Sequence, residues 1–504
     1  MASSKSLAPT ECALSTGVRR PASWTPLITS FEYSHVFEFE RAGFLKTCRC
    51  KRGPGHSGTK GERPLNALIS ELETESHPLA SDERFRERLQ ALDTFLPTYR
   101  PDSEGPSLFA PCTIAGHTLR NRLCALPMDG DDADPNGDPS DATLARWARS
   151  GAAGVGIVWG EGVAVSECGR KSSGQLLPSG HGFERLRQAT LEAHGAQFGD
   201  GRPPILGIQL SHAGRWANAN GVARPRAAFR HPYLDARSQV DDERDVLTDA
   251  ELEDIGEATI RAARMAWDAG FDFVDVEQCH GHLFNELLAA RSRPGRYGGS
   301  LGGRTRLLRR IVAGIQTEAP GIEVAARINL FDLIPLDALW ESGGMTPADP
   351  AAPQAQTTSL SEDELPYRHG FGVKQMEPWR EDPTEPYEVI SLLRSLGITM
   401  INATGGSPHY CPHAQAPGRD AAGKVGPTLV EDPLLSVSRL LNSGRLLKSR
   451  YPDLLCIGSG YSYLGPQLES VARAAVQSQW IDVVGLGRAM GEAPASLPEW
   501  LTHH

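Results

Sequence analysis

Short apolar runs alternate with longer amphipathic stretches along this chain from about residue 121 onward. The apolar runs are rich in β-branched residues and predict buried strands. Between them, leucine, valine and alanine recur at three- and four-residue steps, which predicts helices with one apolar face. A regular alternation of strands and helices indicates repeated β–α units around a parallel sheet.

The pattern predicts eight strands, at 122–128, 154–159, 205–210, 271–276, 322–328, 399–403, 454–457 and 481–485. The clearest helices are expected at 249–269, 304–317, 386–396, 433–449 and 466–477. Asp249, followed by Glu251 and Glu253, is expected to open the first of these helices as a capped, acid-rich start. Eight such units are what a closed (β/α)8 TIM barrel requires.

Residues 1–106 lack a sustained period, and we interpret them as an irregular, partly disordered N-terminal extension of a barrel formed by residues 107–504. An incorrectly assigned start, a disordered tail and an organelle-targeting segment all stay open for this extension. A helical period emerges at 65–96 and is expected to pack on the barrel. Two long connections, 213–247 and 330–383, are expected to shape a substrate pocket. The part after the eighth strand leaves room only for a short closing helix.

Composition narrows the function classes. The chain has 504 residues, 40% of them hydrophobic, and a formal charge of −11, which disfavours nucleic acid and anionic membranes as partners. No apolar run of membrane-spanning length and no export signal appear, so a cytoplasmic protein that is a monomer or a homo-oligomer is expected. The nine cysteines are scattered and odd in number, which is typical of reduced thiols. Cys48, Cys50 and His56 do not complete a tetrahedral set, so no metal is expected.

Titratable side chains crowd the end of the fourth predicted strand. Glu277, His280 and His282 lie within six positions there, directly after the apolar run 271–276. In a parallel barrel the carboxyl ends of the strands carry the active site. One histidine alone would be read as a loop residue, but three ionisable groups together favour catalysis.

Other strand ends supply residues for an anionic cofactor. The seventh and eighth strands end in the glycine turns Gly458-Ser459 and Gly487-Arg488, the usual place of a phosphate site in such barrels. Gln209 and Arg327 would offer an amide and a fixed cation to a heterocycle with carbonyl and imide edges, such as a flavin. Taken singly, each residue also fits a structural role: a steric turn, a loop hydrogen bond or an ion pair.

The chain resembles the old yellow enzyme family, in particular its NADH:flavin oxidoreductase branch. The resemblance covers roughly residues 109–490 and rests on an ordered set of motifs: ALPMDG, GQLLP, IQLSHAGR, VDVEQCHGHL, RPGRYGGS, VAARIN and VVGLGR. It implies an FMN-dependent enzyme that transfers hydride from NADH or NADPH through the flavin to an activated alkene, an α,β-unsaturated carbonyl or nitro compound. The cofactor-binding residues implied are Pro127, Met128, Asp129, Gly162, Gln209, Arg327, Gly458, Ser459, Gly487 and Arg488.

The implied catalytic residues depart from the family pattern. His280 occupies the second position of the pair that binds the substrate oxygen, but the first position holds Glu277. An ionised carboxylate has no proton to donate, so Glu277 can serve as a donor only if burial keeps it protonated. His282 replaces the usual tyrosine proton donor, and it is expected to act as the acid. A charged Asp129 beside the flavin would lower the flavin potential.

Three other interpretations stay open to different degrees. A degenerate barrel that binds flavin with little turnover is favoured slightly by Glu277 and the irregular N-terminal part. A flavin-free phosphate-binding barrel, such as an isomerase or aldolase, is disfavoured because the lysines after residue 172 lie in polar loop or helix contexts. A reductase with an iron–sulfur cluster would need a closely spaced cysteine set beyond the barrel, which the sequence lacks. The natural substrate, a small molecule, and the preferred nicotinamide are not readable from the sequence.

Overall fold

The computed structural model describes residues 79, 81–199, 201–219, 221–335, 365–418 and 431–491. The chain divides into two compact units, 1–69 and 70–504, and all the described residues belong to the second. The first part of the expected extension therefore lies outside the described residues. The boundary at residue 106 stays a prediction.

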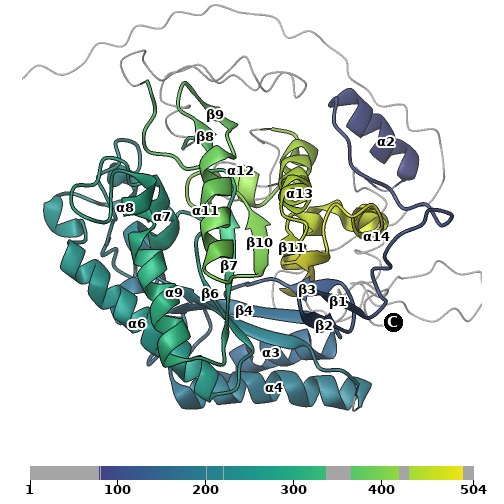
Figure 1. The fold of residues 1–504 in the computed structure, drawn as a ribbon, viewed down its shortest axis with the longest axis horizontal. Helices are drawn as coiled ribbons and strands as arrows, with labels where there is room; N and C mark the ends of the chain where they lie inside the picture. The colour runs from purple at the N-terminus through teal and green to yellow at the C-terminus, as the bar shows by residue number, and fades with distance from the viewer. Residues whose placement is uncertain are drawn as a thin grey trace, which may run out of the picture. The chain divides into compact units, whose positions relative to one another are not determined.

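Eight parallel strands close into a barrel, in the order of the chain, and the last of them pairs with the first (Figure 1). They are β3 (Leu123–Ala125), β4 (Ile157–Ala164), β5 (Ile205–Ser211), β6 (Phe273–Val276), β7 (Glu323–Asn329), β10 (Met400–Thr404), β11 (Leu455–Gly458) and β12 (Val483–Leu486). Each corresponds to one of the expected strands. The predicted (β/α)8 barrel is confirmed.

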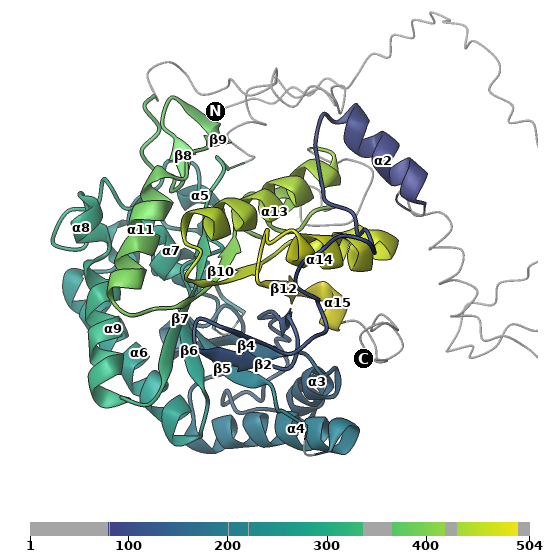
Figure 2. The same cartoon turned by 45° about the vertical axis from the view of Figure 1, so that its right-hand side comes forward.

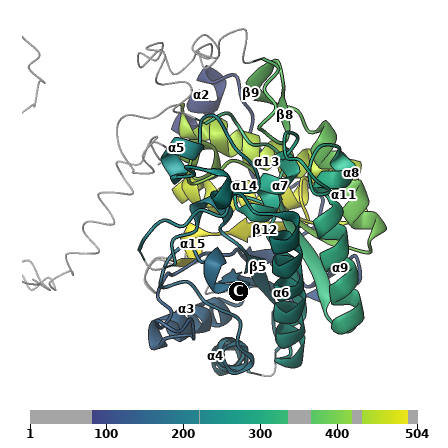
Figure 3. The same ribbon diagram turned by 90° about the vertical axis from the view of Figure 1, so that its left-hand side faces the viewer.

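Helices cover the outside of this sheet, and α6 and α9 run side by side along it (Figure 3). The longer helices are α3 (Asp141–Ala152), α4 (Gly180–Phe198), α6 (Asp249–Asp268), α9 (Arg306–Glu318), α11 (Thr384–Ser395), α13 (Pro433–Arg450) and α14 (Leu468–Gln477). The shorter helices are α5 (Asp235–Ser238), α7 (Leu283–Ala289), α8 (Leu301–Arg304), α12 (Pro412–Gln415) and α15 (Arg488–Gly491). Short 3₁₀ turns are η1 (Glu167–Gly169), η2 (Gly214–Trp216), η3 (Glu243–Asp245) and η5 (Tyr461–Gln467).

The helix expected from Asp249 begins there, since α6 covers Asp249–Asp268 with Asp249 and Glu251 in its first turn. Thr248, and not Asp249, caps α6: its hydroxyl accepts the backbone N–H of Glu251, and the Glu251 carboxylate accepts the backbone N–H of Thr248. This reciprocal capping box satisfies two donors that the first turn of a helix leaves free. Asp249 instead pairs with Arg293 in the loop that precedes α8.

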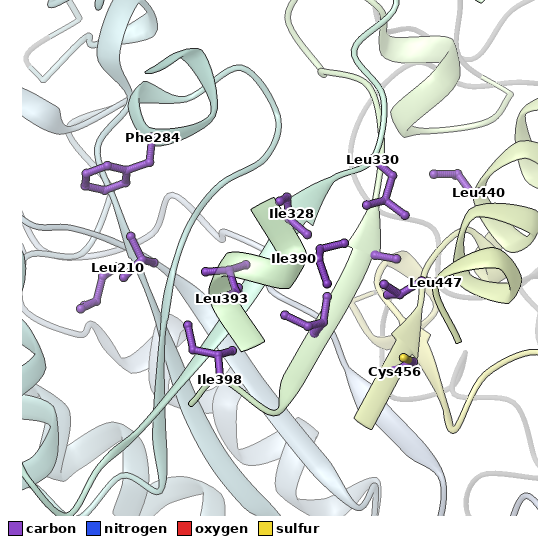
Figure 4. Close-up of a cluster of buried hydrophobic side chains, with 14 of the residues drawn as sticks. Leu210, Phe284, Ile328, Leu330, Ile390, Leu393, Ile398, Leu440, Leu447 and Cys456 are labelled. Carbon is purple, nitrogen blue, oxygen red and sulfur yellow. The ribbon is translucent and has the colours of Figure 1, made fainter. Parts of the chain in front are cut away.

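Two apolar layers stabilise the barrel. Inside it, Trp159 and Phe273 pack edge to face with ring centroids 5.0 Å apart, and Gly207 makes room because a side chain there would meet the Phe273 ring. Outside the barrel, side chains of β7 and β10 pack against side chains of the surrounding helices. Ile390 and Leu393 of α11, labelled in Figure 4, belong to this outer layer. Burial on both faces explains why these strands read as continuous apolar runs.

The described part of the N-terminal region packs on the barrel, as the helical period suggested. Helix α2 (Asp82–Ala91) lies beside α13 and α14 (Figure 2), and its Phe85 and Leu89 are buried in the main apolar cluster. Arg88 forms an ion pair with Asp432 at the start of α13. A small hairpin of β1 (Cys112–Ile114) and β2 (His117–Leu119) then leads into β3 and packs against the interior cluster.

The two long connections carry structure of their own. The first contains η2, α5 and η3. The second includes a hairpin of β8 (Val373–Lys374) and β9 (Glu377–Glu381), with its residues 336–364 outside the described part. Among the described residues, none of the helices combines the length and apolar character of a membrane span.

Candidate active site

The parallel pairing brings the expected residues to one rim of the barrel, where the strands end. Gly162 of β4 pairs in register with Gln209 of β5, and Gln209 pairs with Asp275 of β6. Arg327 of β7 pairs with Asn402 of β10. The sequence placed most of these residues correctly because strand order alone fixes which ends are neighbours.

Asp275, which sequence reasoning missed, ties four strands together beneath this rim. Its fully buried carboxylate accepts hydrogen bonds from Gln209 Nε2 at 2.6 Å, from the Arg327 backbone N–H at 2.8 Å and from Trp159 Nε1 at 3.0 Å. Burial raises the pKa of Asp275 to about 7, although these hydrogen bonds oppose the rise. A single acidic residue inside an apolar run was the signal that would have found it.

Asp129, which follows β3, does not stand alone as a charge. Its carboxylate accepts the backbone N–H of Gly162 at 2.7 Å and pairs with Lys171 Nζ at 3.0 Å. Lys171 also pairs with Asp131. Burial would lower the pKa of Lys171, but the two aspartates outweigh burial and hold the pKa above its usual value. The sequence-based expectation of a lone negative charge beside the flavin therefore omitted a neutralising cation.

The cluster after β6 is assembled around Glu277. Its carboxylate lies 2.7 Å from His282 Nδ1 and 3.7 Å from His280 Nδ1, and all three side chains are buried. Burial alone would raise the pKa of Glu277, but the neighbouring histidines outweigh it and hold the pKa well below its usual value. The condition set for Glu277 as a hydrogen-bond donor, that burial keeps it protonated, is not met.

His280 differs from Glu277 in that its side chain is uncharged near pH 7. Its backbone adopts φ +66°, an unusual conformation for a residue other than glycine, and its Nε2 is buried without a hydrogen-bond partner among the described residues. Burial, with the positive charge of Arg327, lowers the pKa of His280 to about 4. The imidazole is therefore neutral near pH 7. It carries one N–H, which can reside on Nε2 because the 3.7 Å separation from Glu277 is too long for a hydrogen bond at Nδ1.

The glycine turns at the seventh and eighth strands are neighbours, as expected. Gly458 pairs in register with Val484, and Gly485 allows the two strands to approach closely because a side chain there would meet the Gly458 carbonyl. Ser459 accepts a hydrogen bond from Asn402 Nδ2 at 3.1 Å. After the neighbouring strand, β12, Gly487 lies beside Met128, and Arg488 begins α15.

The rim offers unmatched polar atoms that fit a flavin. Arg327 Nε and Asn402 Oδ1 lie on adjacent strands and are both buried without hydrogen-bond partners among the described residues. A buried polar atom without a partner is costly, so such atoms mark positions where a bound group supplies the bond. A flavin ring carries both acceptors and donors along its edges, which suits this pair. Pro127 is buried at the same rim, after β3.

Two further residues at the rim were missed. His409 follows β10, and its Nε2 lies 3.4 Å from His282 Nε2. Trp216 of η2 stacks on His409, with ring centroids 4.5 Å apart. His409 follows the sixth strand and Trp216 follows the third, and both were visible in the sequence, but no role was assigned to either residue.

The expectation that no metal is bound stays a prediction. Ligating atoms of Glu277, Cys279 and His280 lie within 4.8 Å of one another, a spacing compact enough for an ion. The same carboxylate is already engaged by His282.

An eight-stranded parallel barrel whose strand ends gather buried charges and unmatched polar atoms is a (β/α)8 barrel of the kind that carries an active site at this rim. Residues 107–341 match the model of the NADH:flavin oxidoreductase / NADH oxidase family. The resemblance seen in the motifs is confirmed.

Relatives from bacteria and fungi with dehydrogenase or oxidoreductase names are similar to this chain in sequence. The chain is 32% identical over 238 residues to an NADPH dehydrogenase of Geobacillus sp. (strain WCH70), covering 45% of this chain and 64% of that protein. It is 25% identical over 430 residues to an NADH:flavin oxidoreductase of Gibberella zeae, covering 79% of this chain and 88% of that protein. The aligned part thus spans less than two thirds of the bacterial enzyme, and most of the fungal protein.

Among solved structures, a complex of 2-naphthoyl-CoA reductase matches with a TM-score of 0.54 and 20% identity, covering 78% of this chain and 51% of that one. At this identity the match supports the fold alone.

Proposed function

We propose that this chain is an FMN-dependent oxidoreductase that takes a hydride from NADPH or NADH and delivers it to an activated alkene, an α,β-unsaturated carbonyl or nitro compound. The match to the NADH:flavin oxidoreductase / NADH oxidase family model, and the similarity to an NADPH dehydrogenase, support the flavin and the nicotinamide. The observation that carries the proposal is the pair of unmatched atoms on adjacent strands, Arg327 Nε and Asn402 Oδ1, at a rim that also holds Gln209.

The residues proposed to hold FMN fall into two groups. Gln209, Arg327 and Asp129 would face the ring system, with Pro127, Met128 and Gly162 packing around it. The turns Gly458-Ser459 and Gly487-Arg488 would take the phosphate, since their glycines let backbone N–H groups approach an anion closely. Bound FMN would supply two-electron hydride chemistry, and the side chains of this chain would bind, orient and protonate.

His280 is proposed to bind the oxygen of the substrate. Its neutral imidazole can present Nε2–H toward the acceptor, where it would stabilise negative charge that develops on oxygen during hydride transfer. Glu277 cannot share this task, because its surroundings, His282 foremost, hold its pKa well below the usual value and leave it without a proton to donate. We assign Glu277 instead to orienting His282, whose Nδ1–H it accepts at 2.7 Å.

Two experiments on the purified full-length chain test the proposal. Absorbance in the flavin bands, before and after reconstitution with FMN, shows whether the cofactor binds. Anaerobic bleaching by NADPH or NADH, followed by reoxidation with cyclohexenone, shows whether the alkene is an acceptor.

Each outcome has a clear meaning. Protein that stays colourless with excess FMN would refute the proposal outright. A flavin that binds but is not bleached by either nicotinamide identifies the degenerate barrel. A flavin that is bleached, but is reoxidised by oxygen and by no alkene, refutes the acceptor class alone.

A further inference from the structure

His409 is held beside the cluster that follows β6 by contacts from two loops. Its imidazole stacks almost parallel on Trp216, at an interplanar angle of 10°. Its backbone N–H donates to Ser407 Oγ at 3.2 Å, and that hydroxyl donates to the carbonyl of His280 at 2.7 Å. The segments after β6 and β10 are therefore joined, and the 3.4 Å approach of His409 to His282 is part of a fixed arrangement.

The two nitrogens of His282 face different partners. Nδ1 lies 2.7 Å from a Glu277 oxygen, and since an ionised carboxylate only accepts, Nδ1 carries a proton. Nε2 faces Nε2 of His409, and two such nitrogens form a hydrogen bond only when one proton lies between them. Glu277 and His282 are buried, whereas His409 is partly exposed, so the three groups lead from the interior to the surface.

We propose that Glu277, His282 and His409 form a proton relay, and that the proton shared by the two imidazoles is the one delivered to the substrate. The inference rests on the function proposed above. His409 acts through His282 and is a positioning residue. The 3.4 Å separation is long for a hydrogen bond, so little hydrogen-bond energy is lost when the shared proton is given to a substrate.

The reaction balances with this relay. The alkene gains a hydride at one carbon, with two electrons that come from NADPH or NADH by the chemistry that FMN supplies. It gains a proton at the neighbouring carbon, from the nitrogen pair of His282 and His409. The relay then takes one proton back from solvent through His409, and the nicotinamide leaves oxidised.

Charges around the relay favour a single shared proton. His409 is faced by His282, Lys171, His280 and Arg237, and burial, together with the positive charges among these neighbours, holds its pKa well below the usual value. His282 is faced by Glu277 on its other side, and His212 lies near enough to interact with its charge. The positive groups keep a second proton off His409, while Glu277 draws the shared proton toward His282.

A measurement on FMN-free protein tests the relay independently of activity. In protein labelled with ¹⁵N at histidine, the ring signals of His409 should shift when Glu277 is replaced by Gln, although the two residues do not touch. The expected cause is the loss of the charge that holds the shared proton on His282. Unchanged His409 signals in the Glu277→Gln variant would overturn the relay, whether or not the enzyme reduces alkenes.

Kinetics of the FMN-loaded protein test its use. His409→Phe keeps the ring that stacks on Trp216 but removes both nitrogens. Flavin bleaching by NADPH should stay within about twofold of wild type, while reoxidation by cyclohexenone should slow about tenfold to a hundredfold, the lower part of what proton donors contribute. His409→Ala should slow reoxidation likewise, and in this variant added imidazole should restore a large part of the rate, because it can occupy the space left by the missing ring and carry the proton.

The matched control is His117→Gln. His117 is another partly buried histidine beside a carboxylate, that of Glu323. His117 lies in the hairpin that precedes β3, and Glu323 lies at the start of β7. This variant should leave both half-reactions unchanged. Slow reoxidation of the His409→Ala variant without imidazole rescue would indicate a structural role, and reoxidation of both His409 variants at the wild-type rate would show that His409 is not needed; either result overturns the relay.

Discussion

The buried carboxyl of Asp275 should make the stability of the protein fall as the pH rises. Burial raises its pKa from 3.8 to about 7 in the folded protein. Between these values the folded chain holds a proton that the unfolded chain has released. By linkage, the stabilisation from that proton is complete below pH 3.8 and is lost as the pH rises through 7.

The size of the effect follows from the shift. Each pKa unit corresponds to about 1.4 kcal/mol. Between pH 5 and pH 8 the native carboxyl passes from protonated to ionised while the unfolded one is already ionised, so about 2–3 kcal/mol of unfolding free energy should be lost through this group alone. Replacing Asp275 by Asn removes the titration and should flatten the curve by that amount.

Asparagine also has a cost that does not depend on pH. One acceptor oxygen becomes an N–H donor, so either the Arg327 backbone N–H or the Trp159 and Gln209 donors lose their acceptor. An unsatisfied buried donor costs about 1–3 kcal/mol. The whole curve should therefore lie lower at pH 5, while its slope is smaller.

The assay is urea unfolding of the FMN-free protein at pH 5, 6, 7 and 8, with Asp332→Asn as the matched control. Asp332 is likewise buried, and burial raises its pKa to about 7, but it hydrogen-bonds to Asn329 rather than to Gln209. Both variants should flatten the pH dependence. Only Asp275→Asn should weaken FMN binding, about tenfold, since it releases Gln209.

A wild-type slope in the Asp275→Asn variant would show that this carboxyl is ionised throughout the range, and the reasoning from burial would be refuted. Equal loss of FMN affinity in both variants would refute the claim that Asp275 acts by holding Gln209.

Three other outcomes are expected. Asp129→Asn should raise the midpoint potential of bound FMN because it removes the negative half of a 3.0 Å ion pair, and Lys171→Met should lower the potential because it removes the positive half. Shifts of the same sign in a redox titration would contradict this. Arg327→Met should weaken FMN binding at least tenfold in a fluorescence titration while the FMN-free protein melts as wild type does, and unchanged affinity would argue against the placement of the ring. Phe85→Ala, at a fully buried site in α2, should cost about 3–5 kcal/mol and speed hydrogen exchange in that helix first; uniform acceleration across the barrel would show that α2 does not open independently.

The alternation of apolar runs and amphipathic stretches was sufficient to predict all eight barrel strands. It succeeds because strands buried on both faces leave continuous apolar runs, and because consecutive β–α units place successive strands side by side. The same logic placed Gly162, Gln209, Arg327 and the glycine turns on one rim. Strand order fixes the neighbourhood of strand ends before any side chain is placed.

Only the tertiary structure decided the chemical state of these residues. The sequence showed Glu277, His280 and His282 together but not the separations of 2.7 and 3.7 Å that join them, and so left open whether Glu277 is protonated. It showed Asp129 but not Lys171, and His282 but not His409, because these partners come from different loops. Charge and proton positions depend on distances of a few ångströms between segments far apart in the chain, whereas the fold depends on a periodicity that each segment carries by itself.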